Sequence, residues 1–210
     1  MEFILKMSEK QSILINGIVG ELEINVAEPV KKEGNWVVIC HPHPSYGGTM
    51  NNKVITTLQK SFHLLGYGTV IFNFRGVGSS VGSYDGGIGE QEDLSAVVDW
   101  LRTSFEVEEL ILSGFSFGGY IALKKATQLQ ADGLCIVAPA VGMYDFSDIH
   151  INVDWTLIQG GEDEVISSQE VVEWAMKQPV VPDLYWRATA SHFFHRQLVW
   201  LRGVIKLTYK

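Results

Sequence analysis

The chain has 210 residues and a formal net charge of −8, and 46% of its residues are hydrophobic. This composition is ordinary for a globular protein large enough to bury a full core, so we expect residues 1–210 to form a single domain. The acidic balance argues against nucleic acid and against an anionic membrane surface as partners, because both require a basic face on the protein.

The two cysteines, Cys40 and Cys135, each lie in an apolar run, which favours buried free thiols and a reducing compartment. No apolar run approaches the length of a membrane span, and the apolar stretch at the start of the sequence is too short for a secretory signal. We therefore expect a cytoplasmic protein.

After a strand pair expected over 12–29, short apolar runs alternate with segments of helical periodicity. In chain order we expect strand 36–40, helix 53–66, strand 67–75, helix 92–105, strand 109–115, a helix after Ser116, strands 133–140 and 154–160, helix 168–178, strand 183–189 and helix 195–210. Segments 41–52 and 76–90, rich in glycine or proline, should be loops. This order predicts an α/β protein with an open, mostly parallel twisted sheet of about eight strands and helices on both faces. Ligands bind such sheets beyond the carboxyl ends of the strands.

The segment Gly114-Phe115-Ser116-Phe117-Gly118 ends an expected strand and opens an expected helix. In a chain with this much glycine the G-x-S-x-G pattern alone is a weak signal, but a nucleophile elbow requires this strand-to-helix position. The glycines allow the backbone to turn sharply enough to lift the hydroxyl of Ser116 above the sheet. The N–H of Phe117, unpaired at the start of the helix, would form half of an oxyanion hole.

A serine hydroxyl is a poor nucleophile without a base, so the elbow demands a carboxylate and a histidine after later strands, in the order Ser, Asp or Glu, His. Asp163 follows the strand expected over 154–160, and His192 follows the last expected strand. On this interpretation Ser116 attacks an acyl carbon, His192 transfers the proton, and Asp163 holds the imidazole.

Both partners of Ser116 have alternatives nearby in the sequence. The alternative carboxylates are Glu162, Glu164, Asp145 and Asp148. The alternative base is His195, three residues beyond His192. We favour His192 because a last helix starting near residue 193 would enclose His195, whereas a triad histidine needs the freedom of a loop.

Four motifs carry a resemblance to a known family: HPHPSYGGTMNNKV (41–54), FNFRGVGSSVGSYDGGIGEQEDL (72–94), GFSFGG (114–119) and ASHFF (190–194). Over nearly its whole length the chain resembles the α/β-hydrolase superfamily, and within it a compact bacterial group of predicted hydrolases. The resemblance implies an α/β-hydrolase fold with no large cap domain, a Ser-His-Asp triad and no cofactor. Superfamily members often show Gly-x-x-Asp-x-Val at the acid position, and Gly160 and Val165 give that spacing around Asp163.

The resemblance places the second oxyanion donor in the loop after the strand that ends at Cys40. The two prolines of this loop lack an N–H, which leaves His43, Ser45 and Tyr46. The superfamily pattern His-Gly-x, laid on residues 41–43, implies His43 as the donor, with proline in place of the usual glycine. The side chain of Tyr46 is a candidate for substrate binding, through its hydroxyl or as part of the pocket wall.

Two further patterns in these loops have simpler interpretations. His41 and His43 are spaced as a metal pair would be, but no third ligand is evident nearby, so we expect no metal and give His41 a structural hydrogen bond. The loop 76–90 lacks the spacing and the Lys-Ser/Thr ending of a phosphate-binding loop. We expect Arg75 and Glu90 to pair and hold this loop.

Together these features predict a serine hydrolase that cleaves a small or medium acyl ester or thioester through an acyl-enzyme intermediate, with a small-molecule acyl compound as its partner. Without a lid the site should be accessible and shallow. Peptides are the second candidate substrate class, since minimal superfamily members resemble the catalytic domain of prolyl-oligopeptidase-type peptidases. A binding module on a hydrolase scaffold is the non-enzymatic alternative, and acyl transfer to an alcohol would use the same residues.

Overall fold

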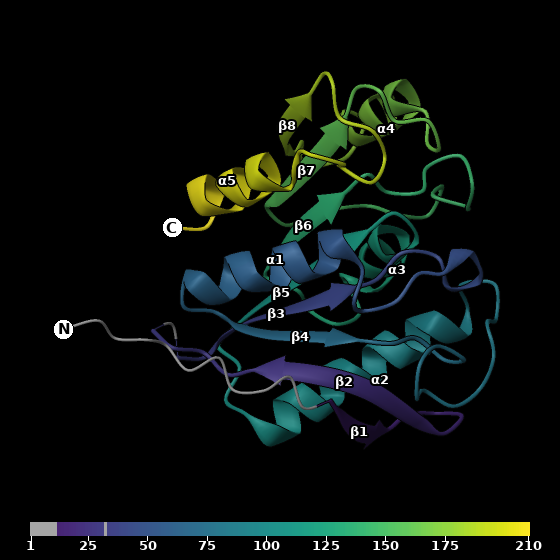
Figure 1. Ribbon diagram of the computed structural model, residues 1–210, viewed down its shortest axis with the longest axis vertical. Helices are drawn as coiled ribbons and strands as arrows, with labels where there is room; N and C mark the ends of the chain where they lie inside the picture. The colour runs from purple at the N-terminus through teal and green to yellow at the C-terminus, as the bar shows by residue number, and fades with distance from the viewer. Residues whose placement is uncertain (1–11, 32) are drawn as a thin grey trace.

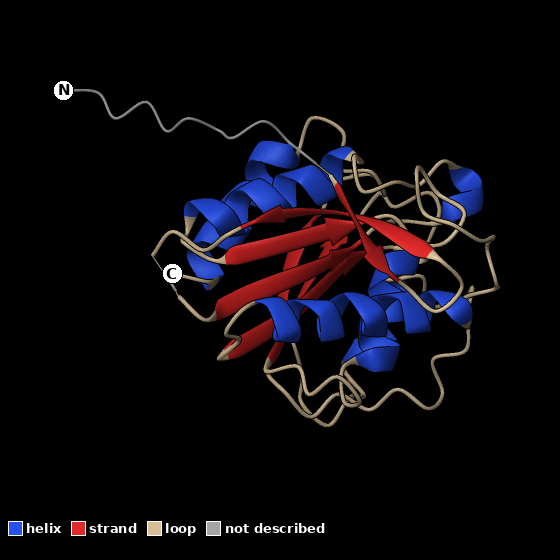
Figure 2. Cartoon of the chain, turned by 90° about the horizontal axis from the view of Figure 1, so that it is seen from below, coloured by secondary structure: helices blue, strands red, loops and turns tan. Residues whose placement is uncertain are grey.

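The computed structural model describes residues 12–31 and 33–210 of the chain (Figure 1). The expectation of no secretory signal concerns residues 1–11, which lie outside the described residues. Within the described part of the chain, an eight-stranded sheet carries helices on both faces (Figure 2). The α/β architecture predicted from the alternation of strands and helices is confirmed.

The strands lie in the order β1-β2-β4-β3-β5-β6-β7-β8. Strand β2 runs antiparallel to both of its neighbours. The other six strands beyond it in the sheet are mutually parallel: β4, β3, β5, β6, β7 and β8. The bounds are β1 Ile13–Asn16, β2 Glu21–Ala27, β3 Asn35–Cys40, β4 Gly68–Phe72, β5 Glu109–Phe115, β6 Gly133–Val137, β7 Trp155–Gly160 and β8 Asp183–Arg187.

The α-helices divide between the two faces of the sheet. Helices α1 and α5 pack against each other on one face, whereas α2, α3 and α4 contribute to the core on the other face. The bounds are α1 Lys53–Leu64, α2 Gly89–Ser104, α3 Phe117–Lys125, α4 Ser168–Ala175 and α5 Leu198–Thr208. Among the described residues, no helix combines the length and the apolar character that crossing a bilayer requires.

The central strands are apolar on both sides because each face of the sheet is covered. In β3, for example, Val38 and Cys40 belong to the core under α2 and α3, while Val37 and Ile39 belong to the core under α1 and α5. This explains why the strand reads as a continuous apolar run rather than as an alternating pattern.

The register of the parallel strands brings the expected site residues to one edge of the sheet. Cys40, the last residue of β3, lies opposite Gly114 in β5. Phe115, the last residue of β5, lies opposite Val137 in β6. The loop after β3 and the turn at Ser116 therefore leave the sheet side by side.

Several elements differ from the expected ones: strands 67–75 and 133–140 end earlier, at Phe72 and Val137, and helix 92–105 begins earlier, at Gly89. Two further differences have an identifiable reason. Helix α5 begins at Leu198 rather than at 195, because Phe194 and Arg196 have φ angles of 51° and 61°, which a right-handed helix does not allow. The loop 41–52 contains a short 3-10 helix over Pro44–Tyr46, since proline suits the first position of a helix.

Candidate active site

Ser116 lies in the turn between β5 and α3 with φ 56° and ψ −117°, a conformation that side-chain-bearing residues rarely adopt. Its N–H is bonded to the carbonyl oxygen of Val137 at 2.9 Å. A Cβ on Gly114 would lie 2.2 Å from the carbonyl oxygen of Gly118, and a Cβ on Gly118 would lie 2.2 Å from that of Cys40. The two glycines are thus required by close backbone contacts on both sides of the serine.

The hydroxyl of Ser116 lies beside the imidazole of His192, with 3.1 Å between Oγ and Nε2. On the far side of the ring, Nδ1 lies 2.8 Å from Oδ2 of Asp163. Because a carboxylate accepts hydrogen bonds, Nδ1 carries the proton and Nε2 is left to accept from the serine hydroxyl. The structure therefore brings these three residues, each from the end of a different strand, into one hydrogen-bonded chain.

The carboxylate of Asp163 is buried and held by four hydrogen bonds. Oδ1 accepts from the backbone N–H groups of Val165 and Ile166 at 2.9 and 2.8 Å. Oδ2 accepts from Nε2 of Gln159 at 3.1 Å as well as from His192. Burial alone would raise the pKa of Asp163, but the hydrogen bonds, that from His192 foremost, hold this pKa below its ordinary value. The side chain is therefore an ionised group fixed in position.

The other acidic candidates have different surroundings. Oε2 of Glu164 accepts a hydrogen bond from the backbone N–H of His192 at 3.0 Å, which ties the histidine loop to the loop after β7. Glu162 is exposed. Asp145 and Asp148 are bonded elsewhere, to a backbone N–H of their own loop and to a lysine of α3.

His195 lies outside this hydrogen-bonded chain. Its side chain is exposed, and its ring centre lies 5.9 Å from that of Phe193. The expectation that His195 would lie inside the last helix is wrong, because α5 begins at Leu198. His192, by contrast, is buried, and its ring packs 4.9 Å from the ring of Phe115.

Of the three candidates for the second oxyanion donor in the loop after β3, only His43 has a backbone N–H without a hydrogen bond among the described residues. The N–H of Ser45 is bonded to Nδ1 of His43 at 3.1 Å, and the N–H of Tyr46 is bonded to the carbonyl oxygen of His43 at 3.2 Å. No hydrogen bond within the described part of the chain uses the N–H of His43. Phe117 is the first residue of α3, so its N–H has no acceptor in the helix. His43 and Phe117 thus offer two unpaired donors, and their rings lie 5.2 Å apart.

His41 is buried beneath this loop and braces it, as expected. Its Nδ1–H donates to the carbonyl oxygen of Pro42 at 2.6 Å, and its Nε2 accepts from the N–H of Phe74 at 3.1 Å. Burial lowers the pKa of His41 to about 4, so the ring is neutral near pH 7. No three His, Cys, Asp or Glu residues gather in a way that could hold a metal ion anywhere in residues 12–31 and 33–210.

An aromatic cluster borders the serine on the side of the sheet that α2 and α3 cover. The cluster consists of His43, Tyr46, Tyr84, Phe117 and Tyr144. The ring of His43 is central, with its centre 4.7 Å from the rings of both Tyr46 and Tyr84. The hydroxyls of Tyr84 and Tyr144 lie 3.1 Å apart. Tyr46 is 82% exposed and therefore lies at the open rim of the cluster rather than in a closed pocket.

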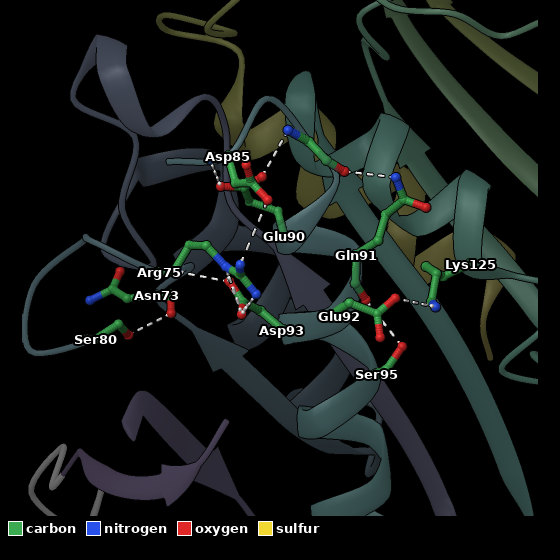
Figure 3. Close-up of polar contacts among 11 residues, drawn as sticks. Asn73, Arg75, Ser80, Asp85, Glu90, Gln91, Glu92, Asp93, Ser95 and Lys125 are labelled. Atoms are coloured by element: carbon green, nitrogen blue, oxygen red, sulfur yellow. Dashed lines mark hydrogen bonds and ion pairs between the residues drawn. The ribbon is translucent and has the colours of Figure 1, made fainter. Parts of the chain in front are cut away.

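The glycine-rich loop that carries Tyr84 is held by a buried polar network (Figure 3). Arg75 does not form the expected ion pair with Glu90; it pairs with Asp93, with 2.7 Å between Nη2 and Oδ1. Glu90 instead accepts hydrogen bonds from the backbone N–H groups of Asp85 and Gly87, at 2.9 and 2.8 Å. Both acids lie in the first two turns of α2, the helix that follows the loop. Asp93 binds Arg75, where the loop begins, and Glu90 binds backbone N–H groups near the end of the loop.

Sequence reasoning missed two side chains that support the hydrogen-bonded chain. Gln159 bonds the carboxylate of Asp163, and Glu164 bonds the backbone of His192. The sequence indicates Glu164 as an alternative acid, but it does not indicate this hydrogen bond. Neither contact has a signal in the sequence. The first depends on the turn that the chain makes directly after β7, and the second depends on how the loops after β7 and β8 meet.

The sheet and the elbow are those of the α/β-hydrolase fold, and the protein is a serine hydrolase of that fold. Residues 17–156 match the model of the X-Pro dipeptidyl-peptidase (S15) family, and the chain belongs to this family.

The chain is also similar to solved structures of α/β serine hydrolases and to a further bacterial sequence. The chain is 40% identical to a protein of Xanthomonas campestris described as an α/β serine hydrolase without lid, with a TM-score of 0.91 over 95% of this chain and 93% of that one. It is 41% identical to an α/β serine hydrolase homologue from Coxiella burnetii, again with a TM-score of 0.91, over 95% of this chain and 97% of that one. An uncharacterized protein of Rickettsia prowazekii is 33% identical over 76% of this chain and 69% of its own length.

Proposed function

We propose that this protein hydrolyses small or medium acyl esters or thioesters through an acyl-enzyme intermediate on Ser116. The observation that carries the proposal is the hydrogen-bonded chain from Oγ of Ser116 through His192 to the buried carboxylate of Asp163. It supplies a nucleophile, a base in the required tautomer and a group that stabilises the charged imidazole.

In the proposed reaction, Oγ of Ser116 attacks the acyl carbon while its proton passes to Nε2 of His192. The N–H groups of His43 and Phe117 donate to the oxyanion that forms. The bond to the alcohol or thiol then breaks, and His192 returns the proton to the departing oxygen or sulfur. Water attacks the acyl-enzyme in the same manner, and the products are one carboxylic acid, one alcohol or thiol, and the free serine.

The aromatic cluster is the proposed contact surface for the acyl group. Phe117 follows the nucleophile directly, and His43 and Tyr46 continue the cluster outward to the solvent. Aromatic rings bury much apolar area with few rotatable bonds, which suits short aliphatic or aromatic acyl groups. Long acyl chains would extend past Tyr46 into water and gain little further burial.

Peptides are a second candidate substrate class, favoured by the family to which the chain belongs. Amide hydrolysis would use the same groups, with His192 giving the proton to a departing amine. The preference between esters and amides is tested by comparing an Xaa-Pro p-nitroanilide with p-nitrophenyl esters of two to eight acyl carbons.

The first experiment is intact-mass analysis after incubation with a fluorophosphonate. We expect one adduct on the wild type and none on Ser116→Ala, followed by turnover of the short p-nitrophenyl esters. An unmodified, folded wild type would contradict the proposal and favour a binding module on the hydrolase scaffold. Faster turnover of the Xaa-Pro substrate than of every ester would instead favour a peptidase.

A further inference from the structure

A cavity of about 170 Å³ opens next to His192, on the side of the sheet that carries α1 and α5. It is lined by Asn52, Lys53, Phe193, His195, Arg196 and Leu198. The ring of Phe193 connects the cavity to the proposed base, because its centre lies 5.1 Å from the ring of His192. The cavity therefore shares a wall with the reaction centre but is not part of the hydrogen-bonded chain described above.

The cavity is cationic in an otherwise acidic protein of net charge −8. Lys53 and Arg196 contribute two positive charges to its lining. Neither forms an ion pair with any carboxylate among the described residues, whereas Arg75 and Lys124 are both paired. Two unneutralised cations at one cavity make a favourable place for an anionic group.

The turn that presents these groups is held in a costly backbone conformation. Phe194 and Arg196 both have positive φ angles, 51° and 61°, which residues with side chains adopt infrequently. The side chain of Phe194 is fully buried and stacks on Trp200 with 6.3 Å between ring centres. This anchor leaves Phe193, His195 and Arg196 exposed along the wall of the cavity.

The chemistry of the proposed reaction decides which half of the substrate reaches this cavity. His192 must return its proton to the leaving group, so the leaving group has to lie on the His192 side of the serine. The aromatic cluster lies on the other side, around Phe117, and suits the acyl half. A leaving alcohol that extends past His192 would enter the cavity along Phe193.

We propose that this cavity is a subsite for an anionic group, a carboxylate or a phosphate, carried by the alcohol or thiol half of the substrate. Lys53 and Arg196 would bind the anion, and the ring of Phe193 would pack on the part of the leaving group between the anion and the ester. The inference rests on the proposed hydrolase function and adds a substrate class to it.

The test compares two esters that share an acetyl group and differ in one charge: 4-acetoxybenzoate, with a carboxylate on the leaving group, and its neutral methyl ester. The readout is the ratio of their kcat/KM values, which cancels general effects on catalysis or folding. We expect Arg196→Gln to lower this ratio at least 5-fold and Lys53→Gln/Arg196→Gln to lower it further. Arg202→Gln, which changes an exposed arginine on α5 outside the cavity, should leave the ratio at the wild-type value.

A second measurement distinguishes the two kinds of anion. Benzoate and phenyl phosphate are compared as competitive inhibitors of methyl ester hydrolysis, and the stronger one identifies the preferred group. Inhibition should weaken at least 5-fold in Arg196→Gln. An unchanged ratio in both cavity variants, with normal fluorophosphonate labelling of Ser116, would overturn the subsite and leave the hydrolase proposal intact. Loss of labelling in the wild type would instead overturn the hydrolase proposal itself.

Discussion

Glu164 holds the backbone of His192, and not its ring, through a hydrogen bond of 3.0 Å from the histidine N–H to Oε2. The adjacent residue, Asp163, holds the ring. Two consecutive acidic residues therefore fix the two parts of one histidine. This arrangement makes Glu164 a positioning residue for the proposed base.

We predict that Glu164→Ala lowers kcat for p-nitrophenyl acetate about 10-fold with little change in KM, because a displaced base slows proton transfer more than it weakens substrate binding. Glu164→Gln keeps an acceptor oxygen and should recover most of the activity. Glu162→Ala, which changes an exposed acid two residues earlier in the same loop, is the matched control. Equal activity of Glu164→Ala and Glu162→Ala would show that the hydrogen bond does not position His192.

Replacement of Ser116 should reveal the strain at the elbow. Its φ of 56° and ψ of −117° suit glycine but not alanine. We therefore expect Ser116→Gly to unfold with a free energy about 1 kcal/mol higher than Ser116→Ala, even though glycine loses more chain entropy on folding. Urea unfolding of the two inactive variants measures the difference. A less stable glycine variant would mean that the turn is relaxed.

His41 should make stability depend on pH between about 6.5 and 4. Its pKa is about 4 in the folded protein because it is buried, whereas an unfolded histidine titrates near 6.5. The unfolded chain thus binds more protons in this window, and folding stability falls as the pH is lowered, by about 3 kcal/mol at most. The contribution of Asp163 is lost at lower pH, since its folded pKa lies below its ordinary value.

Urea unfolding from pH 7 to pH 4.5 tests this prediction. The slope of unfolding free energy against pH should be smaller for His41→Gln than for the wild type, whatever the stability of the variant at pH 7. Parallel slopes for the two proteins would contradict the assignment of a neutral, buried His41.

Replacing only one partner of the ion pair between Arg75 and Asp93 should lower the free energy of unfolding substantially. The carboxylate of Asp93 is fully buried, and both its oxygens contact the guanidinium (Figure 3). Removal of one partner leaves the other as an uncompensated charge, so we expect Arg75→Met to destabilise the protein by about 3–5 kcal/mol. Arg75→Met/Asp93→Leu should regain a substantial part of this loss in urea unfolding. If the double variant is as unstable as Arg75→Met, the loss of stability does not come from the uncompensated charge of Asp93.

The sequence predicted the fold well because the signals for it are local. Short apolar runs such as 36–40 and 109–115 identify buried parallel strands, and Gly66 identifies the end of α1, where its φ of 101° excludes most other residues. The start of α5 was placed too early because its apolar periodicity extends upstream. Nothing in that pattern shows that Phe194 and Arg196 adopt left-handed conformations, which depend on how Phe194 is buried.

For the candidate site, sequence order was enough to place Ser116, Asp163 and His192 after three strands that end at the same edge of the sheet, where the three side chains meet. The partner of Arg75 could not be chosen in the same way. Glu90 and Asp93 both lie at the start of one helix, and the choice between them depends on the path of the loop 76–88. Contacts made by loops with each other are set by tertiary packing rather than by spacing.

The distance along the chain between Ser116 and His192 has a consequence for biosynthesis. The two residues are 76 positions apart, and the histidine follows β8, the last strand of the sheet in chain order. During synthesis, β5, Ser116 and α3 leave the ribosome well before residue 192 does. Ser116 therefore has no base until His192 has emerged and β8 has paired with β7 at the edge of the sheet. On the proposed mechanism the nascent chain does not react with acyl groups before that point, and reactivity toward a fluorophosphonate would report the completion of the fold.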